Sequence, residues 1–188
     1  MYEPAAVTFR QYSRAHDVDA PTRDALVECW VAVTNAGGAA GFPFPPVTAA
    51  EVAPVAERLI ADLDPARSRL LVAVADKEPI GWLNVRRGLD PLIAHWGTLH
   101  HVQTRPDVRG RGIGAALARG ACAMARDDMG LEQLRLTARA GMGLEDFYGR
   151  LGWKEIGRWP GALRFGAGNG VGAGDGDDRD EILMILTL

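Results

Sequence analysis

The segment from Arg109 to Leu117 reads Arg-Gly-Arg-Gly-Ile-Gly-Ala-Ala-Leu, and it decides the fold expected for the rest of the chain. It follows a strand-like segment, Trp96 to Thr104, and leads into apolar residues spaced as on one face of a helix. Its three glycines let several main-chain N–H groups turn toward one point without steric cost. The first N–H groups of a helix have no partner within it and carry partial positive charge. This glycine-rich loop is therefore predicted to bind a phosphate.

Two common nucleotide-binding motifs do not fit this loop. A P-loop ends in Gly-Lys-Ser/Thr, whereas Gly114 is followed by two alanines, so the lysine and the hydroxyl for magnesium are missing. A dinucleotide fingerprint has its third glycine where this chain has Ala115, and it lies early in a βαβ unit. The remaining alternative is a tight strand-to-helix connection whose arginines face solvent.

Two further segments accompany the glycine-rich loop. Directly before it stands Val102-Gln103-Thr104-Arg105-Pro106-Asp107-Val108, and downstream stands Leu144-Glu145-Asp146-Phe147-Tyr148-Gly149-Arg150-Leu151-Gly152-Trp153. The glycine-rich loop itself fits the pattern Arg/Gln-x-x-Gly-x-Gly/Ala. In order and spacing, the three segments resemble motifs of the GNAT superfamily of N-acetyltransferases: the first its strand-four ending, the loop its pyrophosphate loop, and the last its Phe-Tyr-x-x-x-Gly-Phe helix ending.

The resemblance implies an α/β GNAT fold over residues 1–188 as a single domain. Its central sheet would be mixed and mostly antiparallel, with about seven strands, flanking helices and a splay between strands four and five. The resemblance also implies acetyl-CoA as cosubstrate and no metal. The coenzyme-binding residues that it implies are Val102, Gln103, Thr104, Arg109, Gly110, Arg111, Gly112, Ile113, Gly114 and Ala115.

Composition agrees with one compact enzyme domain. The 188 residues are 47% hydrophobic, which is enough for a single sizeable core. A net charge of −3 gives no reason to expect nucleic acid as a partner. With no run of eighteen apolar residues and no basic start before an apolar stretch, we expect a cytoplasmic protein that does not bind membranes. Cys29 and Cys122 lie in apolar helical patterns, so a disulfide or metal site has little support.

Local patterns predict the other elements. Residues 7–12 alternate as in a first strand, and Thr22 is expected to cap the first helix, which ends near residues 35–38. Thr48 and Glu51 predict a capping box for a second helix running toward Leu63. Residues 70–75 and 80–86 predict a hairpin, and residues 131–138 a further strand.

The C-terminal part contains a low-complexity stretch rich in Gly, Asp and Ala. We expect a long hairpin connection, flexible over about residues 166–180, between the last two strands. The acidic residues 175–181 are interpreted as a solvated loop, because calcium-site spacings are absent. The run from Ile182 to Leu188 predicts a terminal strand whose exposed edge would make a homodimer plausible.

Acetyl transfer to an amine requires a proton donor, a polarised carbonyl and a base. The resemblance places the general-acid tyrosine at Tyr148, and a core tyrosine is the alternative. It also places the usual strand-four glutamate at Thr98, which cannot act as a base. His100, on the alternating face of Thr98 and Val102, is then the first candidate and His101 the second. The alternatives are a structural role for either histidine and a base that acts through ordered water. Gly141 replaces an asparagine that contacts the coenzyme in many relatives.

The acceptor is expected to be a primary amine of a small molecule. The resemblance puts its pocket between the connection of the first two helices and the last hairpin, where Trp30, Asn35, Phe42 and Trp159 would line it. The expected function is N-acetyl transfer by direct attack in a ternary complex. The alternatives are an acyl-CoA-binding sensor of the same fold without turnover, acetylation of a protein amine, and a nucleotide-binding module using Arg109 and Arg111.

Overall fold

The computed structural model describes residues 7–38, 41–42, 45–164 and 178–188. Its strands and helices follow in the order β1 (Thr8–Tyr12), η1 (Ala15–Asp17), α1 (Ala20–Asn35), α2 (Ala49–Ala61), β2 (Ser68–Ala75), β3 (Glu78–Arg87), β4 (Trp96–Thr104), η2 (Pro106–Val108), α3 (Ile113–Ala123), the π-helical turn η3 (Met124–Asp128), β5 (Gln133–Arg139), α4 (Leu144–Gly149), β6 (Lys154–Leu163) and β7 (Arg179–Thr187).

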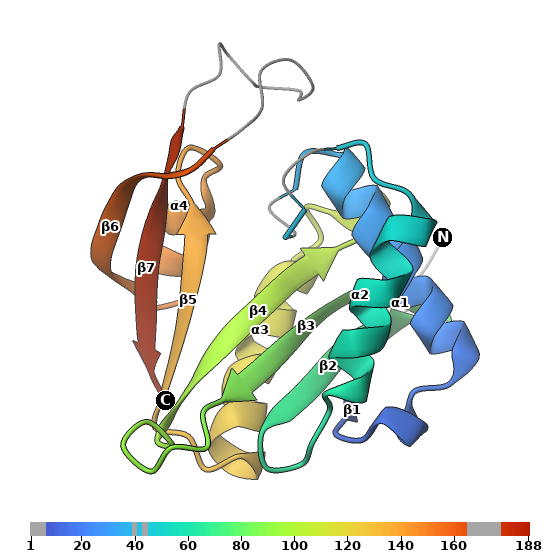
Figure 1. Ribbon diagram of the computed structural model, residues 1–188, viewed down its shortest axis with the longest axis horizontal. Coiled ribbons are helices and arrows are strands. Elements are labelled where there is room, and N and C mark those ends of the chain that lie inside the picture. The colour runs from blue at the N-terminus through green and yellow to red at the C-terminus, as the bar shows by residue number, and fades with distance from the viewer. Residues whose placement is uncertain (1–6, 39–40, 43–44, 165–177) are drawn as a thin grey trace, which may run out of the picture.

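Seven strands form one mixed sheet in the order β1-β2-β3-β4-β5-β7-β6. All neighbours are antiparallel except β4 and β5, which are parallel. Helices α1 and α2 cover one face of the β1–β4 half, and α3 lies behind it (Figure 1). The predicted fold class is therefore confirmed.

The sheet divides where β4 and β5 meet. Their pairing runs only from Trp96↔Gln133 to Thr98↔Arg135, although β4 continues to Thr104 and β5 to Arg139. In Figure 1 the two strands diverge from there, and β5, β7 and β6 form a separate wing. On the β5 side, the main chain of β4 beyond Thr98 thus has no strand partner, which is the predicted splay.

Two hydrophobic clusters form the core, and the first of them spans both halves of the sheet. The first joins α3 and α4 to one face of the sheet through residues such as Leu83, Leu117, Leu134 and Ile182. The second joins α1 and α2 to the opposite face of β2 and β3, with Trp30 and Trp82 fully buried in it. Both faces of β2 and β3 are therefore covered.

Local sequence signals account for several element boundaries. The Glu51 carboxylate accepts a hydrogen bond from the main-chain N–H of Thr48 at 2.8 Å, so the expected capping box is present. The prediction that Thr22 caps the first helix is wrong, because the Asp19 carboxylate caps it by accepting from the Thr22 N–H at 2.9 Å. Asp76 and Lys77, both at positive φ, make the tight turn between β2 and β3.

The prediction that the terminal strand has a free edge is also wrong. Strand β7 pairs with β5 on one side and β6 on the other, so the edges of the sheet are β1 and β6. Glu181 and Asp180 belong to β7 rather than to the loop. Most of the expected flexible connection, residues 166–177, lies outside the described residues. No described helix is both long enough and apolar enough to cross a membrane.

Candidate functional site

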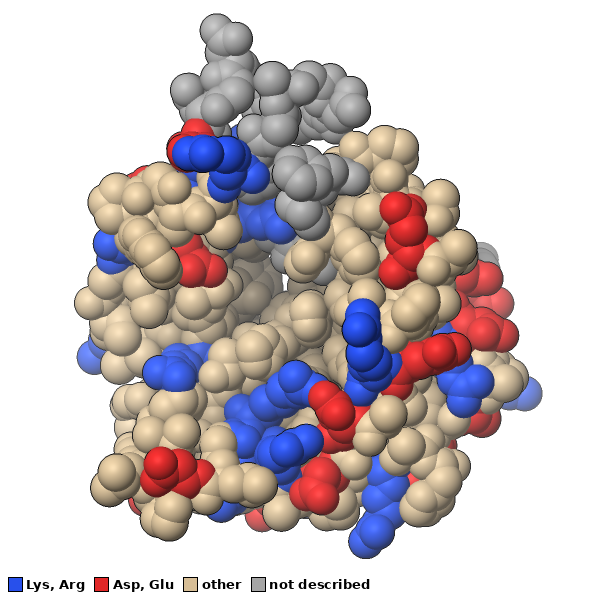
Figure 2. Space-filling view, in the orientation of Figure 1, with Lys and Arg blue, Asp and Glu red and all other residues tan. Residues whose placement is uncertain are grey.

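A cavity of about 960 Å³ opens where β4 and β5 separate. Its wall combines the C-terminal end of α1, residues 98–104 of β4, the glycine-rich loop with the start of α3, residues 136–139 of β5, and α4. Figure 2 shows the surface hollowed between the β5–β7–β6 wing and the rest of the molecule. Because two packed halves of one sheet diverge here, the splay itself makes the cavity.

The glycine-rich loop forms one end of this cavity. Gly110 and Gly112 have φ of 78° and 79°, a conformation that disfavours any residue with a side chain, and Gly112 is the N-cap of α3. The main-chain N–H groups of Ile113, Gly114 and Ala115 begin the helix without partners inside it and line the cavity. This geometry is suited to an anion. Arg109 also lines the cavity, whereas Arg111 does not.

Strand β4 contributes main-chain and side-chain groups to the wall. Val102, Gln103 and Thr104 all line the cavity. Gln103 is 2% exposed, and neither atom of its side-chain amide has a hydrogen-bond partner among the described residues. This amide is therefore a buried polar group whose hydrogen-bonding capacity is unfilled among the described residues.

A bulge in β4 changes the orientation of the histidines. Asn84 pairs with His100 and Trp82 with Gln103, so β4 has one residue more than β3 between the two pairs, and His101 has a φ of 55°. His101 then packs against Trp30, with ring centroids 4.8 Å apart, on the α1 face. Val102 packs against the cluster on the α3 face. His100 is paired with Asn84, whose neighbours Leu83 and Val85 belong to the cluster on the α3 face, so His100 lies on the α1 face. The expectation that His100 shares a face with Val102 is therefore wrong.

Both histidines line the cavity and are partly buried. Burial, with Arg86 nearby, lowers the pKa of His100 to about 4. Burial lowers the pKa of His101 to about 4 as well, and His100 and Arg86 add to the effect. Both imidazoles are uncharged at neutral pH, and both hold a proton weakly.

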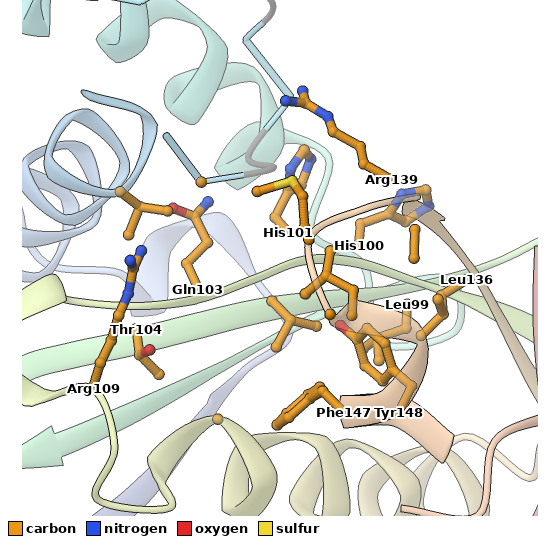
Figure 3. Close-up of a pocket in the computed structure, with 18 of the residues that line it drawn as sticks. Leu99, His100, His101, Gln103, Thr104, Arg109, Leu136, Arg139, Phe147 and Tyr148 are labelled. Atoms are coloured by element: carbon orange, nitrogen blue, oxygen red, sulfur yellow. The ribbon is translucent and has the colours of Figure 1, made fainter. Parts of the chain in front are cut away.

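Tyr148 lies on α4, at the side of the cavity opposite the histidines. Its ring packs edge-on against Phe147 and Trp153, with centroids 4.9 Å and 5.7 Å apart, and Figure 3 shows the phenol oxygen directed into the cavity. Burial raises the pKa of the phenol above its ordinary value. The phenol is therefore protonated at neutral pH and can donate a proton.

The structure does not bring the expected acceptor residues into this wall. Trp30 is 1% exposed and packs edge-on against Phe42 and Trp82. The Asn35 amide is held by the main chain of Val47, donating to its carbonyl at 2.9 Å and accepting from its N–H at 2.7 Å. Trp159 is 65% exposed on β6 and lies outside the cavity lining. An aromatic or amide side chain in the sequence does not by itself show whether the residue packs in the core or lines a cavity.

Several lining residues were not singled out from the sequence. Thr137 and Arg139 of β5 line the cavity, as do Glu181 of β7 and Phe147 of α4. The alternation along residues 133–139 already puts Thr137 and Arg139 on one face, so this signal was present. Among the described residues, no group of histidine, cysteine, aspartate and glutamate could hold a metal ion.

Comparisons with known proteins agree with this architecture. A family model described as the acetyltransferase (GNAT) family matches residues 23–153. A ribosomal-protein-alanine N-acetyltransferase from Brucella melitensis has a similar fold, with a TM-score of 0.70 at 18% identity over 96% of this chain and 99% of that one. An N-acetyltransferase from Staphylococcus aureus Mu50 gives a TM-score of 0.71 at 13% identity over 97% and 99%.

A third solved structure was determined with coenzyme A. This aminoglycoside 6'-N-acetyltransferase gives a TM-score of 0.66 at 14% identity, covering 96% of each chain. A search of curated protein sequences found no match. At these identities, the solved structures establish the shared fold.

Proposed function

Because the chain belongs to the GNAT acetyltransferase family, we propose that it transfers the acetyl group of acetyl-CoA to a primary amine of a small molecule within a ternary complex. The observation that carries the proposal is the continuity of one cavity from the helix N-terminus at Gly112 to the phenol of Tyr148. The helix N-terminus can bind the diphosphate of an acyl-coenzyme, and the phenol can donate a proton at its thioester.

The chain would hold the coenzyme through its main chain. The N–H groups of residues 113–115 are available for its diphosphate. The unpaired side of β4 beyond Thr98 runs from there toward Tyr148, so its N–H groups can bind the extended arm and polarise the carbonyl. Bound acetyl-CoA supplies the thioester that is cleaved. The chain therefore offers both groups of hydrogen-bond donors that such a ligand requires: N–H groups for its diphosphate and N–H groups along its extended arm.

Two side chains would then move protons. As the amine nitrogen bonds to the acetyl carbon and the carbon–sulfur bond breaks, the Tyr148 phenol gives its proton to the departing thiolate. The uncharged His100 imidazole accepts a proton from the amine, directly or through water. Because burial also weakens His100 as a base, we expect its replacement to slow turnover less than replacement of Tyr148.

A sensor that binds acyl-CoA without turnover is the second candidate, and the weak basicity of both histidines favours it. The two functions are distinguished by titrating the protein with acetyl-CoA and measuring free thiol release with a panel of small primary amines. Binding with amine-dependent thiol release is expected. Binding without release for any amine would favour the sensor, and an absence of binding would contradict both.

A further inference from the structure

Three side chains form a row across the β5–β7–β6 wing. Arg139 of β5 is directly opposite Glu181 of β7, which is directly opposite Trp159 of β6. Directly opposed residues of antiparallel strands share a face, with Cβ atoms about 5 Å apart. Their strand neighbours Ala138 and Ile182 are buried on the other face, and within the row Arg139 and Glu181 line the cavity while Trp159 lies just outside its lining. We call Arg139, Glu181 and Trp159 the wing row.

Two members of the wing row are charged and belong to the cavity wall. Glu181 contributes the one carboxylate among the lining residues, and within the described part of the chain no hydrogen bond or ion pair holds it. Arg139 is partly buried, and Figure 3 shows its side chain extended across the cavity, away from Tyr148. A guanidinium has five N–H donors, so Arg139 can hold a ligand carboxylate in addition to other partners.

The wing row lies at a defined distance from the reaction centre. Tyr148 and Leu136 belong to the same hydrophobic cluster and both line the cavity, and Arg139 is three residues further along β5. Three residues of a strand span about 10 Å. Because Leu136 and Arg139 point to opposite faces of β5 and Arg139 extends away from Tyr148, a group held by Arg139 and Glu181 would lie at least one extended amino-acid side chain away from the amine that reacts.

We propose that the wing row binds the remote end of the acceptor, and that this end carries a carboxylate for Arg139 and an ammonium for Glu181. The exposed ring of Trp159 beside Glu181 offers the ammonium a further favourable contact. The acceptor class is then a diamino acid at least as long as lysine, acetylated on its side-chain amine. This assignment rests on the proposed function and specifies its substrate.

Four amines that share one reacting end test the assignment. Lysine carries both remote charges, 6-aminohexanoate only the carboxylate, 1,5-diaminopentane only the remote ammonium, and pentylamine neither. We expect kcat/KM, measured by thiol release, to be highest for lysine and lowest for pentylamine. Each remote charge should contribute roughly tenfold or more, as hydrogen bonds to charged groups do.

Two variants assign each charge to its partner. Arg139→Gln should reduce kcat/KM for lysine and 6-aminohexanoate roughly tenfold and leave 1,5-diaminopentane and pentylamine nearly unchanged. Glu181→Gln should reduce kcat/KM for lysine and 1,5-diaminopentane and leave the other two nearly unchanged. Arg119→Gln and Glu57→Gln, exposed charge-removing variants outside the cavity lining, are the matched controls. Acetyl-CoA affinity and the unfolding temperature show whether each variant is folded.

Two results would overturn the assignment. In one, wild-type protein acetylates pentylamine as well as lysine, or acetylates none of the four. In the other, Arg139→Gln lowers kcat/KM equally for all four amines. The proposed function would survive both results, provided that acetyl-CoA binds and another amine of the wider panel releases thiol.

Discussion

Tyr148 is buried and also lines the cavity. Replacement by phenylalanine keeps the edge-on packing against Phe147 and Trp153 and removes only the proton donor. We expect Tyr148→Phe to lower kcat roughly 100-fold, within the usual range for loss of a general acid. Acetyl-CoA affinity, measured by calorimetry, should stay within about twofold of wild type.

Tyr12→Phe is the matched control, because Tyr12 is a partly buried tyrosine of β1 that packs in the other cluster, outside the cavity lining. Its kcat should equal that of wild type. A Tyr148→Phe variant with unaltered kcat would mean that the departing thiolate takes its proton from another group.

Asn35 has a structural rather than a recognition role in this fold. Its side-chain amide closes the connection between α1 and α2 by bonding both main-chain groups of Val47. Asn35→Ala leaves these groups unpaired and should lower the free energy of unfolding by about 1–3 kcal/mol. Chemical denaturation measures the loss, and acetyl-CoA affinity should hardly change. A large loss of coenzyme affinity at unchanged stability would contradict this role.

Among the elements, the N-terminus of α3 matters most for the proposed chemistry. Gly112 needs its positive φ, and an added Cβ there would meet nothing within 4 Å, so Gly112→Ala is unfavourable through backbone strain alone. The variant should lose about 1 kcal/mol of stability. It should also bind coenzyme A roughly tenfold more weakly, because the N–H groups that follow are displaced.

Gly130 provides the control for this element. It has a φ of 63° and equally open surroundings, but it follows η3 and lies outside the cavity lining. Gly130→Ala should therefore lose similar stability and keep coenzyme affinity. Equal affinities for the two variants, measured by calorimetry, would remove the loop from the binding site.

At the scale of the whole molecule, the two histidines of β4 connect folding to pH. Their pKa of about 4 in the folded protein lies below the ordinary value of 6.5 that they regain on unfolding. Between these values the unfolded chain binds more protons, so stability is complete above about pH 6.5 and falls as the pH drops toward 4. Each histidine should lower the free energy of unfolding by about 2 kcal/mol between pH 7 and pH 5.

The variant His101→Phe tests this dependence, because phenylalanine can pack between Trp30 and Trp82 without titrating. Denaturant unfolding at the two pH values should show a loss smaller than that of wild type by about 2 kcal/mol. His16→Asn, at an exposed histidine, is the control and should behave like wild type. An unchanged loss in His101→Phe would exclude His101 as a source of the pH dependence.

The sequence by itself determined what local interactions control. The glycine-rich loop, the Thr48–Glu51 capping box and the β2–β3 hairpin depend on residues a few positions apart, so their patterns were sufficient. The resemblance between ordered motifs supplied the sheet and its splay. These features were predicted before any long-range contact was known.

Only the tertiary structure decided the features that depend on pairing between strands distant in the chain. The bulge that turns both histidines to one face depends on how β4 fits β3, and alternation along β4 alone predicted the opposite. The place of β7 between β5 and β6 depends on partners distant in the chain, and that place assembles Arg139, Glu181 and Trp159 into one row. Strand register and strand order are set by packing among remote residues, so no local pattern contains them.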